Sequence, residues 1–118
     1  MNERLEWQAE RFWLNLRNQL GFNGKLGRGY CSLWCDWTLD FLPPNLGFRK
    51  ETAYRGECEG LRQTRAGFHS WLQKVQNERR FIADGTAGQF IDDERYQNGF
   101  YGWIEEAPEE LIEIYASY

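Results

Sequence analysis

Apolar residues in the first part of the chain recur at intervals of three and four positions, which is the pattern of an amphipathic helix. We expect this helix to span residues 3–20, with Asn2 as its N-cap and Gly21 at its C-terminal end. Its buried stripe would consist of Leu5, Ala9, Phe12, Trp13, Leu16 and Leu20. The first element is therefore predicted to pack one face against a core.

A glycine-rich segment, residues 21–29, separates this helix from a second and more apolar one. We predict the second helix over residues 31–42, because Pro43 and Pro44 cannot continue it. Its many apolar side chains predict a central and largely buried helix; they are Leu33, Trp34, Trp37, Phe41 and Leu42. A short third helix is expected within residues 49–65.

The apolar period changes to two after Gly67, which is typical of strands. Strands are predicted over residues 68–75, 81–84, 87–91 and 100–104. Pro108 suits the first turn of a closing helix that ends near Tyr115. N-terminal helices followed by a small antiparallel sheet define an α+β fold, and a chain of 118 residues makes one domain, residues 1–118.

Composition narrows the classes of function. The formal net charge is −4, and binding to nucleic acid would need a basic face, so nucleic acid is not an expected partner. Three cysteines are an odd number, which argues against a disulfide framework and favours a reducing compartment. No apolar run reaches the length of a membrane span, and the acidic N-terminus lacks the apolar core of a secretory signal. We expect a cytoplasmic protein, or one delivered by a specialised secretion system, without membrane partners.

The chain has one histidine, His69, on the first strand of a predicted hairpin whose second strand ends at Asp84. If the turn is centred on Gln76 and Asn77, His69 lies directly opposite Asp84 and both side chains share one face. The carboxylate can then hold one ring nitrogen, while the other nitrogen faces outward and acts as a base.

Cys31 follows the glycine-rich segment and opens the second predicted helix. The unpaired amides and the positive dipole end of a helix N-terminus lower the pKa of a thiol, and a nearby imidazolium does the same. The same amides can stabilise a developing oxyanion. Cys35 lies one turn further along and is expected in the core, whereas Cys58 is expected to be an exposed or half-buried bystander. A nucleophile, a base and an orienting acid are thus available in Cys31, His69 and Asp84.

Three short motifs occur in order along the chain: Gly29-Tyr30-Cys31, His69-Ser70-Trp71 and Asp84-Gly85-Thr86. The third continues with Gln89-Phe90. They resemble the motifs of the transglutaminase-like and papain-like superfamily of cysteine enzymes. Members carry Gly-x-Cys at the start of a buried helix, His-x-Trp on one strand and Asp-x-Thr on the next. The usual residue after that aspartate is proline, where this chain has Gly85.

The resemblance implies a papain/transglutaminase-like core with Cys31 as the nucleophile, His69 as the base and Asp84 as its orienting acid. Gln89 and Trp71 would support the site, Gln89 as a candidate oxyanion donor, and Cys35 is the alternative nucleophile. The chemistry implied is acyl transfer from an amide, with no cofactor and no metal. We expect deamidation or transglutamination of a glutamine in a protein substrate, as carried out by a bacterial effector or toxin, with a cognate inhibitor or immunity protein as a further partner.

Three alternatives are left open. A cysteine protease would use the same three residues. A catalytically inactive relative would instead serve as a protein-binding module. The third is a zinc site formed by Cys31, Cys35, Cys58 and His69, although the chain has no Cys-x-x-Cys loop and two of these ligands would come from one helix.

Overall fold

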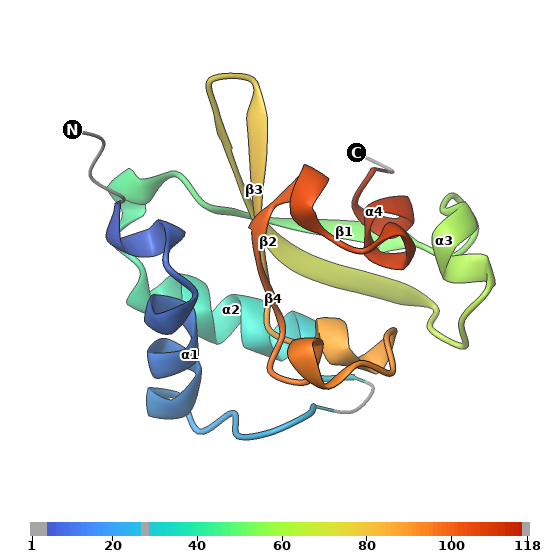
Figure 1. The fold of residues 1–118 in the computed structure, drawn as a ribbon, viewed down its shortest axis with the longest axis horizontal. Helices are drawn as coiled ribbons and strands as arrows, with labels where there is room; N and C mark the ends of the chain where they lie inside the picture. Colours follow the sequence, from blue (N-terminus) through green and yellow to red (C-terminus); the bar gives the residue numbers. More distant parts are fainter. Residues whose placement is uncertain (1–4, 27–28, 117–118) are drawn as a thin grey trace.

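The computed structural model describes residues 5–26 and 29–116, which form an antiparallel sheet with helices on both faces (Figure 1). The strands pair in chain order and are β1 (Arg49–Tyr54), β2 (Phe68–Gln76), β3 (Arg79–Asp84) and β4 (Phe100–Trp103). The helices are α1 (Glu10–Gln19), α2 (Cys31–Phe41), α3 (Glu59–Arg62) and α4 (Glu109–Tyr115). The predicted α+β class is confirmed. Within the described ranges, no helix is long and apolar enough to cross a membrane.

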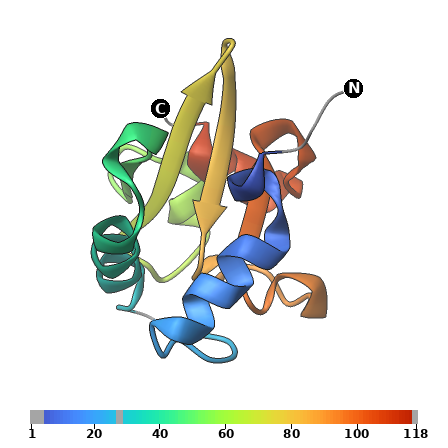
Figure 2. The same ribbon diagram turned by 90° about the vertical axis from the view of Figure 1, so that its left-hand side faces the viewer.

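Two apolar clusters lie on opposite faces of the sheet. The helices α1 and α2 cover one face, here called the α1/α2 face, and the C-terminal segment with α4 lies behind the other, the α3/α4 face (Figure 2). Because side chains alternate along a strand, Leu72 and Ala83 point to the α1/α2 face, whereas Trp71 and Ile82 point to the α3/α4 face. The middle of β2 and the second half of β3 are therefore buried on both sides, whereas the turn end of the hairpin is exposed.

The α1/α2 face is packed with aromatic rings. Trp13 stacks on Tyr101 at a centroid distance of 5.8 Å, and Trp34 is 1% exposed. The prediction that the second helix is largely buried was only half right, because Trp37 is 46% exposed and Phe41 is 63% exposed. A helix that packs against one face of a sheet buries only one stripe, and the remaining apolar side chains of α2 lie outside that stripe.

The β2–β3 hairpin turns at Asn77 and Glu78, both of which have positive φ angles, 52° and 64°. This two-residue turn pairs Gln76 with Arg79. The predicted centre on Gln76 and Asn77 was therefore wrong, and the register differs by two positions from the expected one. Since the side-chain period of a strand is also two, this error leaves each side chain on the face that was predicted.

Other predicted boundaries also change. The short third helix expected within residues 49–65 is present as α3, but it is preceded by strand β1, which was not predicted. Residues 87–89 form a 3₁₀ turn, η3 (Ala87–Gln89), rather than a strand. The first predicted helix is interrupted, because a 3₁₀ turn, η1 (Glu6–Gln8), precedes an extended Ala9 and α1 follows. Its predicted N-cap lies outside the described residues. Gly21 ends α1 as expected, with φ of 86°.

Candidate active site

His69 and Asp84 form a buried pair on the α3/α4 face. Nε2 of His69 lies 2.7 Å from Oδ2 of Asp84, and both side chains are fully buried. The predicted contact is thus present, but not directly across the ladder. The ladder between β2 and β3 ends at the pair of Leu72 and Ala83, so His69 and Asp84 meet beyond its last pair.

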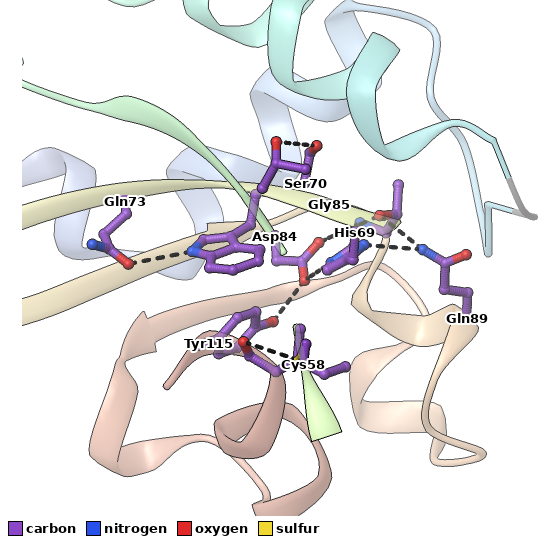
Figure 3. Close-up of polar contacts among 12 residues, drawn as sticks. Cys58, His69, Ser70, Gln73, Asp84, Gly85, Gln89 and Tyr115 are labelled. Atoms are coloured by element: carbon purple, nitrogen blue, oxygen red, sulfur yellow. Dashed lines mark hydrogen bonds and ion pairs between the residues drawn. The ribbon is translucent and has the colours of Figure 1, made fainter. Parts of the chain in front are cut away.

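Four donors surround the carboxylate of Asp84 (Figure 3). Oδ1 lies 3.2 Å from the backbone nitrogen and 3.4 Å from Oγ1 of Thr86, while Oδ2 accepts from the hydroxyl of Tyr115 at 2.6 Å. Burial and the charge of Asp84 raise the pKa of Tyr115 well above its usual value, so the phenol keeps the proton that it donates. The sequence did not predict this contact, because nothing in the closing helix indicates that the hydroxyl of Tyr115 binds a buried carboxylate.

Aromatic rings enclose the imidazole of His69. Trp71 stacks on it at a centroid distance of 5.9 Å, and Phe90 makes a T-shaped contact with it at a centroid distance of 4.6 Å. Burial by such neighbours lowers the pKa of His69, but the charge of Asp84, its hydrogen bond and the Cys31 thiol outweigh burial and raise the pKa to about 9. The ring is therefore held ready to carry a positive charge at neutral pH. Trp71, predicted as a supporting residue, is in contact with the histidine.

Cys31 begins α2, where His69 and the backbone N–H of Ser70 are close enough to lower the pKa of its thiol. The first helical hydrogen bond of α2 runs from the backbone nitrogen of Trp34 to the carbonyl of Tyr30, and no side chain caps this end. The amides of the first turn are thus left for the site. Burial raises the pKa of Cys31, but the hydrogen bond and charge of His69 and the amide of Ser70 outweigh it, so the net pKa is lowered.

The other two thiols differ from Cys31. Cys35, the predicted alternative nucleophile, is fully buried one turn along α2, and burial followed by the charge of Asp84 raises its pKa well above the usual value. Cys58 is 1% exposed, so its prediction as an exposed or half-buried bystander was wrong. Its sulfur lies 3.8 Å and 3.9 Å from the carbonyls of Glu113 and Ile114, which places it under α4.

The packing of Trp34 explains why a glycine follows Asp84. A Cβ atom at this position would lie 2.2 Å from the indole of Trp34, so the packing of α2 against the turn admits only glycine. The carbonyl of Gly85 accepts from Nε and Nη2 of Arg17 at 3.2 Å and 3.0 Å. Arg17 is 2% exposed and had not been predicted, although its place among the apolar positions of the first helix was a signal. Two elements of the α1/α2 face therefore fix the turn after Asp84.

Gln89, the candidate oxyanion donor, lies on the side of His69 away from Asp84 (Figure 3). Its Nε2 is 3.3 Å from Nδ1 of His69 and 3.4 Å from Oγ1 of Thr86. It lines a hollow of about 310 Å³ beside the thiol, whose lining residues are Gly29, Cys31, Ala66, Gly67, Phe68 and Gln89. Cys31 itself is only 3% exposed, so the site is nearly closed.

The alternative of a zinc site finds no support in the geometry. Over residues 5–26 and 29–116, no group of three or more His, Cys, Asp or Glu side chains is placed to hold a metal ion. Nε2 of His69 is engaged by Asp84, and Cys58 faces carbonyls of α4.

Comparison with known proteins returned no matching family model, no matching curated protein and no matching solved structure. The fold and the site define an α+β domain in which a buried histidine is paired with an aspartate and lies near the thiol of a cysteine that begins a helix.

Proposed function

We propose that this protein is a thiol enzyme that transfers an acyl group from the carboxamide of a protein glutamine to water or to an amine. The observation that carries the proposal is the connected set of Cys31, His69 and Asp84, in which the histidine lowers the pKa of the thiol and the carboxylate raises that of the histidine. A thiol needs this arrangement to act as a nucleophile near neutral pH. A papain/transglutaminase-like core is part of the proposal, supported by a cysteine that opens a helix packed on the strand of the histidine.

The reaction follows from these positions. Nδ1 of His69 takes the proton of Cys31, and the thiolate attacks the carbon of the carboxamide. The carbon–nitrogen bond then breaks, and the leaving nitrogen takes the proton from Nδ1 and departs as ammonia. Water attacks the thioester, gives a proton to His69 and releases the acid and the Cys31 thiol. An amine in place of water gives a substituted amide instead.

The oxyanion formed in each step lies next to the sulfur, where α2 begins. Backbone amides at the start of α2 are not capped by a side chain, so they can donate to a negative oxygen. Asp84 keeps Nε2 of His69 protonated and therefore leaves Nδ1 toward the thiol. Each residue thus has one role: Cys31 attacks, His69 moves the proton and Asp84 orients the ring.

Incubation with a glutamine-rich protein and a primary amine tests the activity. Mass spectrometry of its peptides distinguishes replacement of the amide NH₂ by OH, incorporation of the amine, and cleavage of the chain. We expect the first or the second product with the parent and none with Cys31→Ala. Cys35→Ala serves as the control and should retain turnover, whereas loss in Cys35→Ala and retention in Cys31→Ala would assign the nucleophile to Cys35.

The reactivity of the thiols gives a test that needs no substrate. Iodoacetamide should modify Cys31 before Cys35 and Cys58, and should continue to do so below the pH at which an ordinary thiol stops reacting. Cys31 and His69 titrate as a pair, so the ion pair forms above the lowered pKa and is lost as pH rises through about 9. Equal reaction of all three cysteines would contradict an activated nucleophile.

A further inference from the structure

Two neighbouring hollows lie beside the side chain of Gln89, and one of them also contains the thiol of Cys31. One is the hollow beside Cys31, and the other, of about 330 Å³, lies on the far side of Gln89 and Ala66 and is lined by Gln63, Thr64, Arg65, Ala66, Gln89 and Phe90. Gln89 and Ala66 line both. The side chain of Gln89 therefore borders both hollows, including the one in which a substrate would meet the sulfur.

Two acceptors converge on the amide nitrogen of Gln89 when the imidazole of His69 is neutral and carries its proton on Nε2. Nδ1 of His69 and Oγ1 of Thr86 lie 3.3 Å and 3.4 Å from Nε2. A primary carboxamide has two N–H donors and can satisfy both acceptors at once, whereas a peptide nitrogen has only one. The surroundings of this nitrogen are thus suited to a primary carboxamide, and the chain supplies one of its own.

We propose that Gln89 occupies the carboxamide subsite of the resting enzyme, and that the glutamine side chain of a protein substrate displaces it. This inference rests on the proposed function. It makes the preferred substrate a primary carboxamide rather than a peptide bond. It also assigns Gln89 as a positioning residue that covers the site, in place of the oxyanion donor expected from the sequence.

The protonation chemistry fits such a displacement. An NH₂ group only donates, so Gln89 can bind Nδ1 only while that nitrogen carries no proton. Transfer of the Cys31 proton to Nδ1 breaks this contact and makes Nδ1 a donor. A substrate carboxamide in the same subsite then has its nitrogen, the future leaving group, facing the proton that it must receive. By binding the neutral ring, Gln89 competes with the charge of Asp84, which favours the ion pair, and this competition ends when substrate takes the place of Gln89.

Three variants separate this role from an oxyanion role. Iodoacetamide modification of Cys31 is measured across pH in the parent, Gln89→Ala, Gln89→Glu and a control, Gln76→Ala, at the tip of the hairpin (Figure 1). We expect Cys31 to be modified several-fold faster in Gln89→Ala, and the rise of the modification rate with pH to begin at a lower pH. In Gln89→Glu the rise of the modification rate should begin at a higher pH, because a carboxylate beside the sulfur disfavours the thiolate. Gln76→Ala should match the parent.

Turnover of a glutamine peptide completes the test. In Gln89→Ala we expect KM to fall while kcat is retained, and the parent should prefer the glutamine peptide several-fold over its side-chain N-methyl analogue. A loss of about 10² in kcat at unchanged KM would make Gln89 an oxyanion donor and overturn the proposal. Labelling of Gln89→Ala or Gln89→Glu at the parent's rate and pH profile would also overturn it.

Failure of the proposed function has a different signature. In that case Cys31 of the parent reacts no faster than Cys35 and Cys58, and no amide is turned over. Cleavage of the peptide backbone, or equal turnover of the N-methyl analogue, would instead overturn the carboxamide subsite and leave an active thiol enzyme.

Discussion

The two faces of the sheet bury polar groups in different ways. On the α1/α2 face, rings such as Trp13 and Tyr101 fill the space, and the two buried side-chain polar atoms that lack a partner among the described residues, Nε1 of Trp34 and Oγ1 of Thr38, both lie on α2. On the α3/α4 face, His69, Asp84 and Tyr115 form a continuous chain of hydrogen bonds. The first face is held together mainly by apolar packing, with the guanidinium of Arg17 bound to backbone carbonyls, and the second surrounds a connected polar network.

A buried network of hydrogen bonds around a carboxylate is unusual in the core of a small domain. A buried carboxylate is costly unless donors surround it, and here four donors compensate the charge of Asp84. Apolar residues of similar volume would make a simpler core. The α3/α4 face thus carries the buried pair of His69 and Asp84, and the α1/α2 face supplies the thiol from the start of α2.

Asp84→Asn should give the largest effect, a loss of turnover, and should leave the protein folded. The amide would hold His69 in the wrong tautomer, and turnover of a glutamine peptide should fall by about 10⁴. Steady-state kinetics and the pH profile of Cys31 labelling measure this. The variant should still unfold cooperatively in a thermal melt, and a fully active Asp84→Asn would remove His69 and Asp84 from the proposed mechanism.

Trp13→Ala should act on the other face and on stability. Trp13 is 1% exposed and packs against several rings, so its removal should cost about 3–5 kcal/mol in the free energy of unfolding. Urea denaturation measures this value. Trp37→Ala is the matched control: Trp37 is 46% exposed, and its loss should cost less than about 1 kcal/mol. The sequence-based expectation placed Trp37 in the core, and equal losses in both variants would restore it.

Gly85→Ala should affect both faces of the sheet, the packing of one and the active site of the other. The new Cβ would collide with the indole of Trp34, and we expect a loss of about 3 kcal/mol in stability, together with lower activity because the turn also carries Asp84. Thermal melts and labelling of Cys31 report the two effects. Gly56→Ala is the control, since a Cβ there meets nothing within 4 Å. Unchanged stability in Gly85→Ala would show that Trp34 can move away.

Tyr115→Phe should give the smallest effect. It removes one of the four donors to Asp84 and should cost about 1.5 kcal/mol in the free energy of unfolding. Turnover should fall by roughly tenfold, which is a rise of about 1.4 kcal/mol in the activation barrier, because the carboxylate is held less firmly against His69. With less of the carboxylate charge compensated, the pKa of His69 should rise above about 9, and the alkaline limb of activity should move up. Tyr101→Phe is the control on the other face, because its hydroxyl donates to the carbonyl of Asn98. Equal activity losses in both variants would refute a specific role for Tyr115.

The sequence by itself determined most elements and the parts of the site that depend on local order. The periodicities located α1, α2, β2, β3, β4 and α4, and glycine and proline marked the ends of the first two helices. An even hairpin turn was enough to bring His69 and Asp84 to one face, even with the register wrong by two. The position of Cys31 at a helix start also followed from local sequence. These features depend on neighbours along the chain, which a sequence displays directly.

Tertiary structure alone decided which groups complete and cover the site. Tyr115 and Gln89 reach Asp84 and His69 only because distant segments fold back onto the end of β2. The burial of Cys58 and the exposure of Trp37 depend on where α4 and the sheet lie, and hydrophobicity does not distinguish between the two outcomes. Strand β1 was missed because its residues are mostly polar and become a strand by pairing with β2. Contacts between segments far apart in the chain have no local signal, so only the folded chain reveals them.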